Sequence, residues 1–358
     1  MENIRILAIN PGSTSTKIAV YNNTKSAFLK NIKHSASDLG SFRNIASQFE
    51  FRKKHILDEL DDAGIEIESL NAVIGRGGLI KPIPSGVYEV NKAMIRDLKK
   101  GIQGEHASNL GGLIANDIAM TIPAARSFIA DPVVVDEMQD VARITGHPLF
   151  ERRSIFHALN HKAIGRIHAE SIDSEYDKLN LIIAHLGGGI SVGAHKQGRV
   201  IDVNNALDGE GPFSPERTGT LPAGCLARTC FDDNYTHDDV KKMITGHGGL
   251  MAYFNTNDAY EIEIRAGDGD PKAVLIQNAM AYQTGKEIGA MSAVLKGRVH
   301  AIILTGGMAH NPTLVSYIKD MVSYIAPVII YPGEDEMKAL AMNALMVMTG
   351  KIKPKVYS

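Results

Sequence analysis

Two segments of this chain repeat one pattern: a strand-length apolar run, a turn of small or polar residues, and a second strand. The first segment covers residues 6–21 and the second covers residues 181–194. Each begins a half of about the same length, and a chain of 358 residues is long enough for two domains. The sequence therefore predicts two similar domains. We place the first at residues 1–153, joined by a C-terminal helix over about 336–350, and the second at residues 154–335.

Apolar runs of strand length alternate along the chain with stretches of helical periodicity. Gly, Pro, Asn and Asp bound the apolar runs, as is typical of buried strands. The expected strands cover residues 4–9, 18–21, 133–135, 179–184, 199–203, 300–304 and 328–331, and the expected helices cover residues 42–63, 106–120, 273–295 and 337–348. This alternation predicts an α/β fold with largely buried sheets.

The composition excludes several classes of function. Lys plus Arg is 38 and Asp plus Glu is 40, which gives a net charge of −2, and no block of basic residues occurs. We therefore expect neither a nucleic acid nor a membrane as a partner. Cys225 and Cys230 are the only cysteines, and no run of 18 apolar residues occurs. The chain is thus expected to work in the reducing cytoplasm and to lack a transmembrane segment.

The first turn combines a glycine, hydroxyl groups and a lysine directly after an apolar strand. It begins at Asn10 and contains Gly12, Ser13, Ser15 and Lys17. Glycine permits a ligand to approach closely, hydroxyl and N–H groups donate to phosphate oxygens, and lysine adds positive charge. The turn is therefore a candidate phosphate site, although a polar hairpin explains the same residues. Neither the P-loop pattern nor Gly-x-Gly-x-x-Gly occurs in the chain.

Two glycine turns follow later apolar strands. Their residues are His185, Gly187, Gly188 and Gly189 in the first and Gly306, Gly307 and Asn311 in the second. Three consecutive glycines cost backbone entropy, which indicates that something must approach the backbone closely. Together, the three turns predict a nucleotide held in a cleft between two related domains, with the last turn beside the base and ribose.

Four motifs, taken together and in this order, resemble the acetate and butyrate kinase family. They are Asn10-x-Gly-Ser-x-Ser-x-Lys17, Phe156-His157-x-x-x-His161-Lys162, His185-Leu-Gly-Gly-Gly-Ile-Ser191 and Thr305-Gly-Gly-Met-Ala-His-Asn311. The resemblance covers nearly the whole chain. It implies two duplicated domains of the actin-like ATPase (ribonuclease H-like) fold, with a nucleotide cleft between them. It also implies phosphoryl transfer from ATP to a short-chain carboxylic acid.

The resemblance further implies which residues act on the transferring phosphoryl group. They are Arg76, Arg217 and His157, and the resemblance implies that Asp131 positions the substrate or orients an arginine in the same active site. A carboxylate nucleophile is already ionised near neutral pH, so the site needs cations and donors rather than a general base. On the sequence alone, each arginine is also readable as a surface ion-pair partner, and Asp131 as a turn residue before proline. His157 and His161 stand four residues apart, but no HExxH pattern or third ligand supports a zinc site.

Mg²⁺ is the cofactor that the same resemblance implies, with ATP or ADP as the nucleotide. Mg²⁺ takes one or two protein oxygens beside the phosphates of a nucleotide. The residues that match the family's metal side are Asn10 and Glu336, with Glu334 as the alternative to Glu336. An acidic cluster at this position is also typical of the start of a helix.

The expected substrate pocket consists of Arg76, Gly77, Gly78 and His106. Because Gly77 and Gly78 carry no side chains, the sequence predicts apolar room beside the arginine. Gly188 stands where acetate kinases usually have an asparagine. Both features favour butanoate as the acceptor, with acetate, propanoate and branched-chain acids as alternatives.

A function of a different class is a non-enzymatic nucleotide switch with the actin-like fold. A switch needs only contacts to its nucleotide, whereas Arg76 and Arg217 lie outside the glycine turns. We therefore predict an enzyme that binds ATP and a small carboxylic acid. The resemblance implies that the enzyme is a homo-oligomer.

Overall fold

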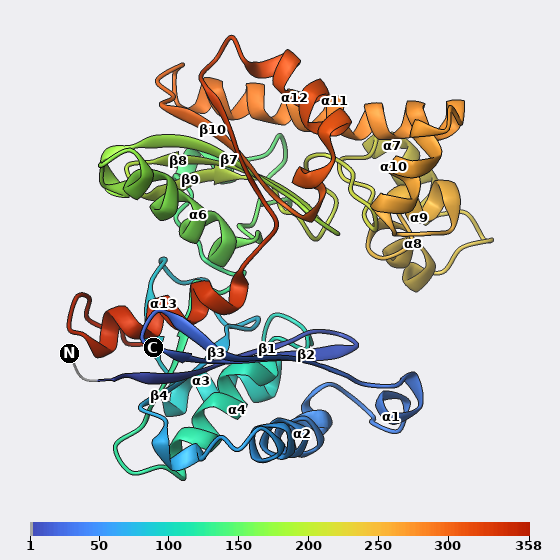
Figure 1. The fold of residues 1–358 in the computed structure, drawn as a ribbon. Coiled ribbons are helices and arrows are strands. Elements are labelled where there is room, and N and C mark those ends of the chain that lie inside the picture. The colour runs from blue at the N-terminus through green and yellow to red at the C-terminus, as the bar shows by residue number, and fades with distance from the viewer. Residues whose placement is uncertain (1–2) are drawn as a thin grey trace. The chain divides into compact units, whose positions relative to one another are not determined.

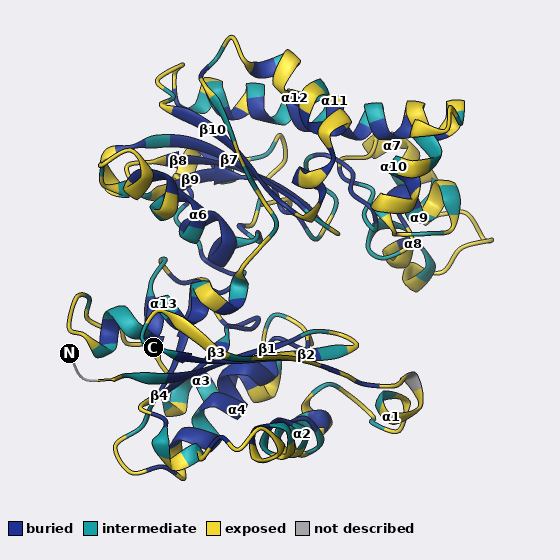
Figure 2. Ribbon diagram, in the orientation of Figure 1, coloured by how far each residue is buried: buried dark blue, intermediate teal, exposed yellow. Residues whose placement is uncertain are grey.

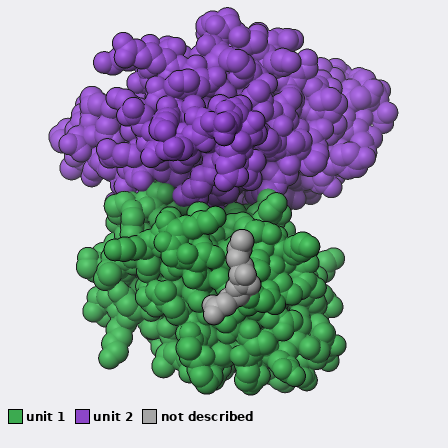
Figure 3. Space-filling model, turned by 60° about the vertical axis from the view of Figure 1, so that its left-hand side comes forward, with its two compact units in different colours: residues 1–135, 335–358 green, residues 136–334 purple. Residues whose placement is uncertain are grey.

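The computed structural model describes residues 3–358 and divides the chain into two compact units, coloured separately in Figure 3. Unit 1 comprises Met1–Val135 and Asp335–Ser358, and unit 2 comprises Asp136–Glu334. The first stretch of unit 1 thus ends at Val135 and not at residue 153. The boundary differs because the segment after Val135 contacts unit 2. Within it, Arg152 forms an ion pair with Asp202 at 2.9 Å.

Unit 1 contains a six-stranded sheet in the order β3-β2-β1-β4-β6-β5 (Figure 1). Its strands are β1 (Arg5–Pro11), β2 (Ser15–Asn22), β3 (Lys25–Lys33), β4 (Ala72–Arg76), β5 (Val87–Glu89) and β6 (Arg126–Ala130). Strands β1, β2 and β3 form an antiparallel meander, and β4 and β6 continue the sheet parallel to β1. The carboxyl ends of β1 and β4 therefore lie at the same edge of the sheet.

Unit 2 repeats this arrangement in a five-stranded sheet of order β11-β10-β7-β8-β9. Its strands are β7 (Asn180–Leu186), β8 (Ile190–Lys196), β9 (Arg199–Val203), β10 (Ala301–Gly306) and β11 (Val328–Pro332). As in unit 1, three antiparallel strands come first, and two parallel strands extend the sheet from the first of them. The predicted duplication is confirmed, because β1 and β7 hold the same place in the two sheets.

Helices cover both faces of each sheet. In unit 1 they are α1 (Ala36–Gly40), α2 (Phe49–Asp62), α3 (Lys92–Lys100), α4 (Asn109–Met120) and α13 (Glu336–Met348). Helix α4 packs on β4 and β6, and α13 packs on the opposite face against β1 and β4 (Figure 1). The fully buried Leu340, Ala341 and Ala344 form the apolar face of α13, the helix expected over residues 337–348.

In unit 2, helices pack on both faces of the sheet, and successive residues of a strand contact the helices on opposite faces. The helices are α5 (Asp140–Arg143), α6 (Ala158–Ser171), α7 (Ala223–Cys230), α8 (His237–Ile244), α9 (Gly249–Phe254), α10 (Ala259–Gly267), α11 (Pro271–Val294) and α12 (Pro312–Val322). Ile182 and Ala184 of β7 pack with α11 and α12, whereas Leu181 and Ile183 pack with α6. Strands β7 and β10 are consequently buried on both faces, as Figure 2 shows.

Two predicted elements differ from the observed ones for local reasons. Residues 133–135 form no strand, because the Val135 N–H donates to the Pro132 carbonyl and closes a turn instead. The helix expected over 42–63 begins only at Phe49. Ahead of it, the Asn44 carboxamide accepts from the Ser47 N–H at 2.9 Å, and such local bonds compete with helix formation. No helix within residues 3–358 is long and apolar enough to cross a membrane.

Candidate active site

The turn between β1 and β2 is held from behind by Arg52 of α2. The Arg52 guanidinium donates to the carbonyl groups of Gly12, Ser13 and Ser15 and to the Thr16 hydroxyl, at 2.9–3.1 Å. The backbone of the predicted phosphate turn is thereby fixed by one side chain. Ser13 is exposed, and Ser15 is half-buried. The hydroxyl groups of the turn can therefore reach a ligand.

Arg52 is fully buried, and its pKa is lowered by that burial. Its Nε–H donates to the Gln48 side chain at 3.0 Å, and among residues 3–358 no carboxylate forms an ion pair with it. The sequence analysis did not identify this residue. The signal was present, because Arg52, Ile56 and Leu60 are spaced by four residues and all lie on the buried face of α2. An arginine on an apolar helix face indicates a built polar contact.

His34 forms the next contact behind the same turn. Its Nε2 atom lies 2.9 Å from the Thr16 hydroxyl, which also accepts from Arg52. Burial, with the nearby charge of Arg52, lowers the pKa of His34 to about 4. The neutral ring is thus part of the folded structure.

We expect the stability of unit 1 to fall as the pH decreases from 6.5 to 4. An unfolded chain protonates His34 near pH 6.5, whereas the folded chain resists protonation until about pH 4. The histidine therefore costs nothing above pH 6.5 and at most about 3 kcal/mol at pH 4. Urea unfolding at several pH values measures this loss. His34→Gln, whose amide oxygen can accept from Thr16, should flatten the profile, whereas the exposed His237→Gln should leave it unchanged.

Asn10, Arg76 and Glu336 converge in unit 1 from the ends of β1 and β4 and the start of α13. Arg76 Nη1 lies 3.0 Å from Glu336 Oε2 and 3.4 Å from Asn10 Oδ1, and the Asn10 amide also donates to Glu336. Helix α13 begins at Glu336 because the Asp335 side chain accepts from the Lys338 N–H and caps it. Within the described part of the chain, Arg76 uses only Nη1 in these contacts. Its Nε and Nη2 donors are left for a ligand.

Glu334, the alternative metal-side residue, lies in unit 2 near His185 Nε2 at 3.6 Å. Lys17 is exposed and lies opposite Asn10 in the β1–β2 register. Of the two glutamates, Glu336 is thus the one that contacts Asn10. The part of Glu336 in a metal site stays a prediction.

Asp131 directly follows β6, the strand paired with β4, and is almost completely buried. Its carboxylate accepts from the Ser85 hydroxyl and the Gly86 N–H, both at 2.7 Å. The residue has a φ of 38°, an unusual conformation for a residue other than glycine. Asp131 therefore fixes the loop at residues 85–86. Through this loop it can position β4, the strand that ends at Arg76.

The predicted apolar room at Gly77 and Gly78 does not exist. A Cβ atom at Gly77 would lie 2.6 Å from the Pro132 side chain, and one at Gly78 would lie 2.4 Å from the Asn109 side chain. These glycines are required by close packing and leave no space for a substrate. The remaining pocket residue, His106, is exposed, and its Nδ1 accepts from the Ser108 N–H at 3.2 Å.

Neighbouring side chains explain why glycine is needed in the turn after β7 of unit 2. A Cβ atom at Gly189 would lie 1.9 Å from Arg217 Nη1, and one at Gly187 would lie 2.7 Å from His185 Nε2. Gly188 has no such contact and is open. Two of the three glycines thus make room for protein side chains, and only Gly188 presents bare backbone to a ligand.

Arg217 lies across this turn with its Nη1 donating to the Ala206 carbonyl at 2.6 Å. Burial lowers the pKa of its guanidinium, and the neighbouring Glu216 partly opposes this. The guanidinium remains positively charged near neutral pH because an arginine pKa lies above 12 in water. A partly desolvated cation beside a glycine turn is suited to binding a phosphate or carboxylate.

His157 and His185 stack on each other in unit 2, with ring centres 3.8 Å apart. His185 Nδ1 lies 2.9 Å from the Asn160 side-chain oxygen, which orients its ring. His157 Nδ1 lies 2.8 Å from the Ser191 hydroxyl of β8. The motif residues of α6 and β8 that the sequence analysis singled out are thus brought together.

A hollow of about 340 Å³ lies beside the glycine turns of unit 2. Its lining combines residues of both turns with apolar side chains of the helices, namely Gly187, Gly188, Gly307, Asn311, Leu250, Met280 and Leu314. Gly306 has a φ of 91° and packs against the Leu186 carbonyl. Asn311 caps α12 by accepting from the Leu314 N–H at 2.9 Å. The hollow has the polar and apolar walls that a nucleotide requires.

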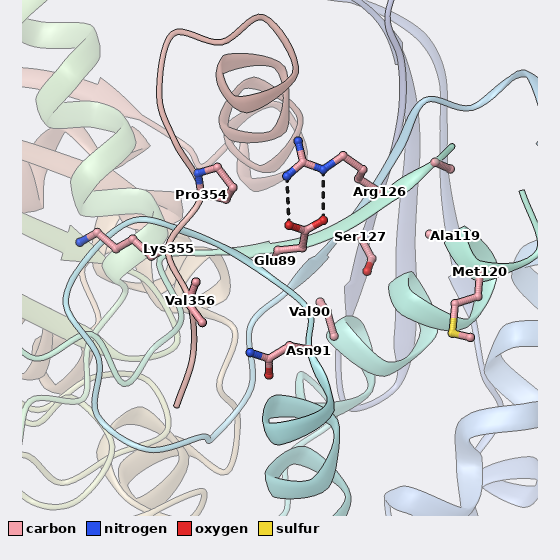
Figure 4. A pocket seen from close by; sticks show the side chains of 11 residues that line it. Glu89, Val90, Asn91, Ala119, Met120, Arg126, Ser127, Pro354, Lys355 and Val356 are labelled. Carbon is pink, nitrogen blue, oxygen red and sulfur yellow. Dashed lines mark hydrogen bonds and ion pairs between the residues drawn. The ribbon is translucent and has the colours of Figure 1, made fainter. Parts of the chain in front are cut away.

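Unit 1 contains a second hollow, of about 380 Å³, which Figure 4 shows. Glu89 and Arg126 form a two-point ion pair across it, with nitrogen–oxygen distances of 3.1 and 3.0 Å. None of the predicted site residues lines it. Because Glu89 and Arg126 already neutralise each other there in a partly exposed ion pair, we assign this hollow no part in the site.

The fold matches solved structures of carboxylate kinases. The acetate kinase of Porphyromonas gingivalis has a TM-score of 0.76 to this chain, at 20% identity over 96% of this chain and 100% of that one. A propionate kinase of Francisella tularensis subsp. tularensis SCHU S4 has a TM-score of 0.75, at 17% identity over 95% and 98% of the two chains. The two-unit α/β fold is therefore that of the acetate and propionate kinases.

Sequence comparison gives the family. The model of the acetokinase family matches residues 145–326. Butyrate kinase 2 and butyrate kinase 1 of Clostridium acetobutylicum are 54% and 55% identical to this chain, and each match covers 99% of both proteins. The chain therefore belongs to the acetokinase family, and the predicted resemblance is confirmed.

Proposed function

We propose that this protein transfers the γ-phosphoryl group of ATP to butanoate and forms ADP and butanoyl phosphate. The observation that carries the proposal is the full-length identity of more than half to two proteins named butyrate kinase. Arg76 at the end of β4 supports it, because its guanidinium has donors left for a carboxylate or phosphoryl oxygen.

The proposed reaction is a direct in-line transfer. A butanoate oxygen attacks the γ-phosphorus, the bond from that phosphorus to the bridging β–γ oxygen breaks, and ADP leaves with the electron pair. No general base is needed because the acid is already ionised. Arg76, Arg217 and His157 would offset the negative charge on the phosphoryl oxygens during transfer. Asp131 would act as a positioning residue through the loop at residues 85–86.

The nucleotide would bind along the glycine turns. The hollow beside Gly188 and Gly307 offers apolar walls for the base, and the open backbone of Gly188 offers N–H groups for phosphate oxygens. In unit 1, the turn with Ser13, Ser15 and Lys17 would supply hydroxyl donors and a positive charge.

Mg²⁺ fits the donor set of unit 1. Glu336 and Asn10 carry a carboxylate and an amide oxygen, the kinds of ligand that this hard cation prefers. Mg²⁺ would take the place of the contacts that Arg76 Nη1 makes to Glu336 Oε2 and Asn10 Oδ1. Within residues 3–358, no group of three or more His, Cys, Asp or Glu side chains could hold a metal ion by itself. Asn10 and Glu336 would therefore hold Mg²⁺ together with the nucleotide phosphates, and the ion would neutralise phosphate charge. A cytoplasmic location and a homo-oligomeric state stay predictions.

Trapping with hydroxylamine tests the reaction. The purified protein is incubated with Mg-ATP and butanoate, and the acyl phosphate formed is captured as a hydroxamate. We expect one ADP for each hydroxamate and no ADP without an acid. ATP hydrolysis that does not depend on an added acid would favour the nucleotide switch instead.

We expect kcat/KM for butanoate to exceed that for acetate by about tenfold. This expectation rests on the two relatives named butyrate kinase, because Gly77 and Gly78 leave no room for the acid. Each methylene that another part of the site buries would contribute about 0.8 kcal/mol, so the two extra methylenes would give slightly more than one order of magnitude. Propanoate should lie between the two acids. Rates at saturating Mg-ATP decide this, and a flat series or one that favours acetate would assign the protein to another short-chain acid.

We also expect Mg-ATP to slow hydrogen exchange in both phosphate turns. Bound phosphates accept hydrogen bonds from backbone N–H groups and thereby hinder exchange. Residues 12–17 of unit 1 and residues 186–191 of unit 2 are the segments to follow by mass spectrometry. Residues 237–244, on an exposed helix outside the site, serve as the control. Protection of one turn alone would show that the nucleotide engages a single unit.

A further inference from the structure

A chain of hydrogen bonds leads from His157 into the interior of unit 2. His157 Nδ1 lies 2.8 Å from Ser191 Oγ, which in turn lies 2.9 Å from His161 Nε2. His161 Nδ1 lies 3.1 Å from His195 Nε2, and His195 Nδ1 lies 2.6 Å from the Tyr176 hydroxyl. Four contacts thus join five side chains without a gap.

Two pairs of residues, each four positions apart in the sequence, supply four of the five side chains in this chain of hydrogen bonds. His157 and His161 lie one turn apart at the start of α6, and Ser191 and His195 lie on the same face of β8. Tyr176, in the short helix that precedes β7, closes the far end. Its ring packs so tightly on Gly165 of α6 that a Cβ atom there would lie 2.6 Å from the ring. The position of the phenol is therefore fixed by packing.

The two inner histidines are neutral. His161, His195 and Ser191 are fully buried, and this burial lowers the pKa of both histidines well below the usual value. The charge of nearby Lys162 acts in the same direction. A neutral imidazole has one N–H donor and one acceptor nitrogen. Each hydrogen bond contains one hydrogen atom, so an imidazole that accepts in one bond must donate in the next. The group that donates at one end therefore determines the donor and the acceptor in every bond of the chain.

We propose that this chain runs from Tyr176 to His157 and holds His157 as the neutral tautomer with its proton on Nε2. Tyr176 donates to His195, His195 to His161, His161 to Ser191, and the Ser191 hydroxyl to His157 Nδ1. The inference rests on the proposed function, in which His157 donates to the transferring phosphoryl group. The Nε2 tautomer supplies that donor without an added positive charge, and Tyr176, His195 and His161 are positioning residues.

Lys162 supports this direction. Its Nζ atom lies 5.7 Å from the centre of the Tyr176 ring, and its side chain is 1% exposed and paired with Glu137 at 2.6 Å. A cation near a phenol stabilises negative charge on its oxygen and makes the hydroxyl a better donor. If the bonds ran in the opposite direction, His157 Nδ1 would carry a proton and donate it to Ser191. His157 could then donate from Nε2 as well only as a charged ring, with protons on both nitrogens, stacked on His185.

The tautomer is measured by nuclear magnetic resonance of protein labelled with ¹⁵N-histidine, near neutral pH. His157→Gln identifies the His157 signals. We expect a protonated Nε2 and an unprotonated Nδ1 in the native protein. Tyr176→Phe keeps the packed ring but removes the donor, so the His157 signals should move toward the other tautomer and kcat should fall by about tenfold. KM for ATP should stay unchanged.

Tyr331→Phe is the matched control. The Tyr331 hydroxyl lies 3.2 Å from Nδ1 of His168, which is on the same helix α6 but is no link in the chain. This variant should leave the His157 signals and kcat unchanged. Should Tyr176→Phe fail to fold, Ser191→Ala removes a single oxygen and breaks the last link, with the same expected shift.

A proton on Nδ1 of His157 in the native protein, or on both nitrogens, would overturn the proposal. Unchanged His157 signals in both Tyr176→Phe and Ser191→Ala would overturn it as well. The proposed function fails separately, because a protein that forms no hydroxamate can still show the expected His157 signals.

Discussion

Alanine at Arg76 or at Arg217 is expected to lower kcat by about 10²–10³-fold, the usual effect of removing a donor that stabilises transition-state charge. Each guanidinium uses Nη1 for contacts within its own unit, so that the rest of the planar group can bind phosphoryl and carboxylate oxygens. The hydroxylamine assay measures kcat, and circular dichroism checks folding. Native turnover by both folded variants would remove these arginines from the site.

Arg126→Ala is the matched control for the arginine variants. Arg126 lies on β6 of the same sheet as Arg76, but it forms a partly exposed ion pair with Glu89 at 3.0 Å. Such pairs contribute little, so kcat should change less than twofold. Arg76→Lys keeps the charge but not the planar fork, and its kcat should lie between those of Arg76→Ala and the native protein.

Gly189→Ala tests whether the glycine acts through Arg217. The new Cβ atom would occupy the place of Arg217 Nη1 and displace the guanidinium. We expect Gly189→Ala to reproduce most of the kcat loss of Arg217→Ala. In the Arg217→Ala background, the same substitution should add little, because the group that it displaces is gone. Additive losses would show that Gly189 serves another purpose.

Replacing Arg52 with alanine is expected to destabilise unit 1 by about 3–5 kcal/mol. The variant leaves the carbonyl groups of Gly12, Ser13 and Ser15 without their buried donor. Urea unfolding followed by circular dichroism measures the loss. Native hydrogen exchange should also become faster in residues 12–17, because this turn loses its support. Unchanged stability and exchange would contradict the role assigned to Arg52.

Two variants of α2 calibrate the Arg52 result. Arg52→Lys retains the charge and up to three donors, but not the fork that reaches several carbonyl groups, so it should recover only part of the stability. Lys54→Ala removes an exposed side chain two residues along the same helix and should change the stability by less than about 0.5 kcal/mol.

The apolar runs predicted the architecture well because a buried strand is recognisable from its own consecutive apolar residues. The runs at residues 4–9 and 179–184 became β1 and β7, and the shared turn pattern after each predicted the duplication. Strand β4, which ends at Arg76, was not among the strands expected from the apolar runs.

Features that depend on contacts between distant segments were not predictable. The absence of a side chain at Gly77 looked like space for an acid, but Pro132 from the end of the next strand fills it. The role of Gly189 depends on Arg217, which lies 28 positions further along the chain. The link from Ser191 to His161 likewise requires a strand and a helix to meet. Local patterns indicate which residues are special without indicating what they touch.

The division of unit 1 into two stretches has a consequence for synthesis on the ribosome. Unit 2 is one continuous segment and can fold as soon as Glu334 has emerged. Unit 1 must wait for Asp335–Ser358, because α13 covers the apolar face over β1 and β4 and brings Glu336 to Arg76. Unit 1 begins to be made first but is completed after unit 2, and the nascent chain exposes this face of the sheet until α13 has emerged.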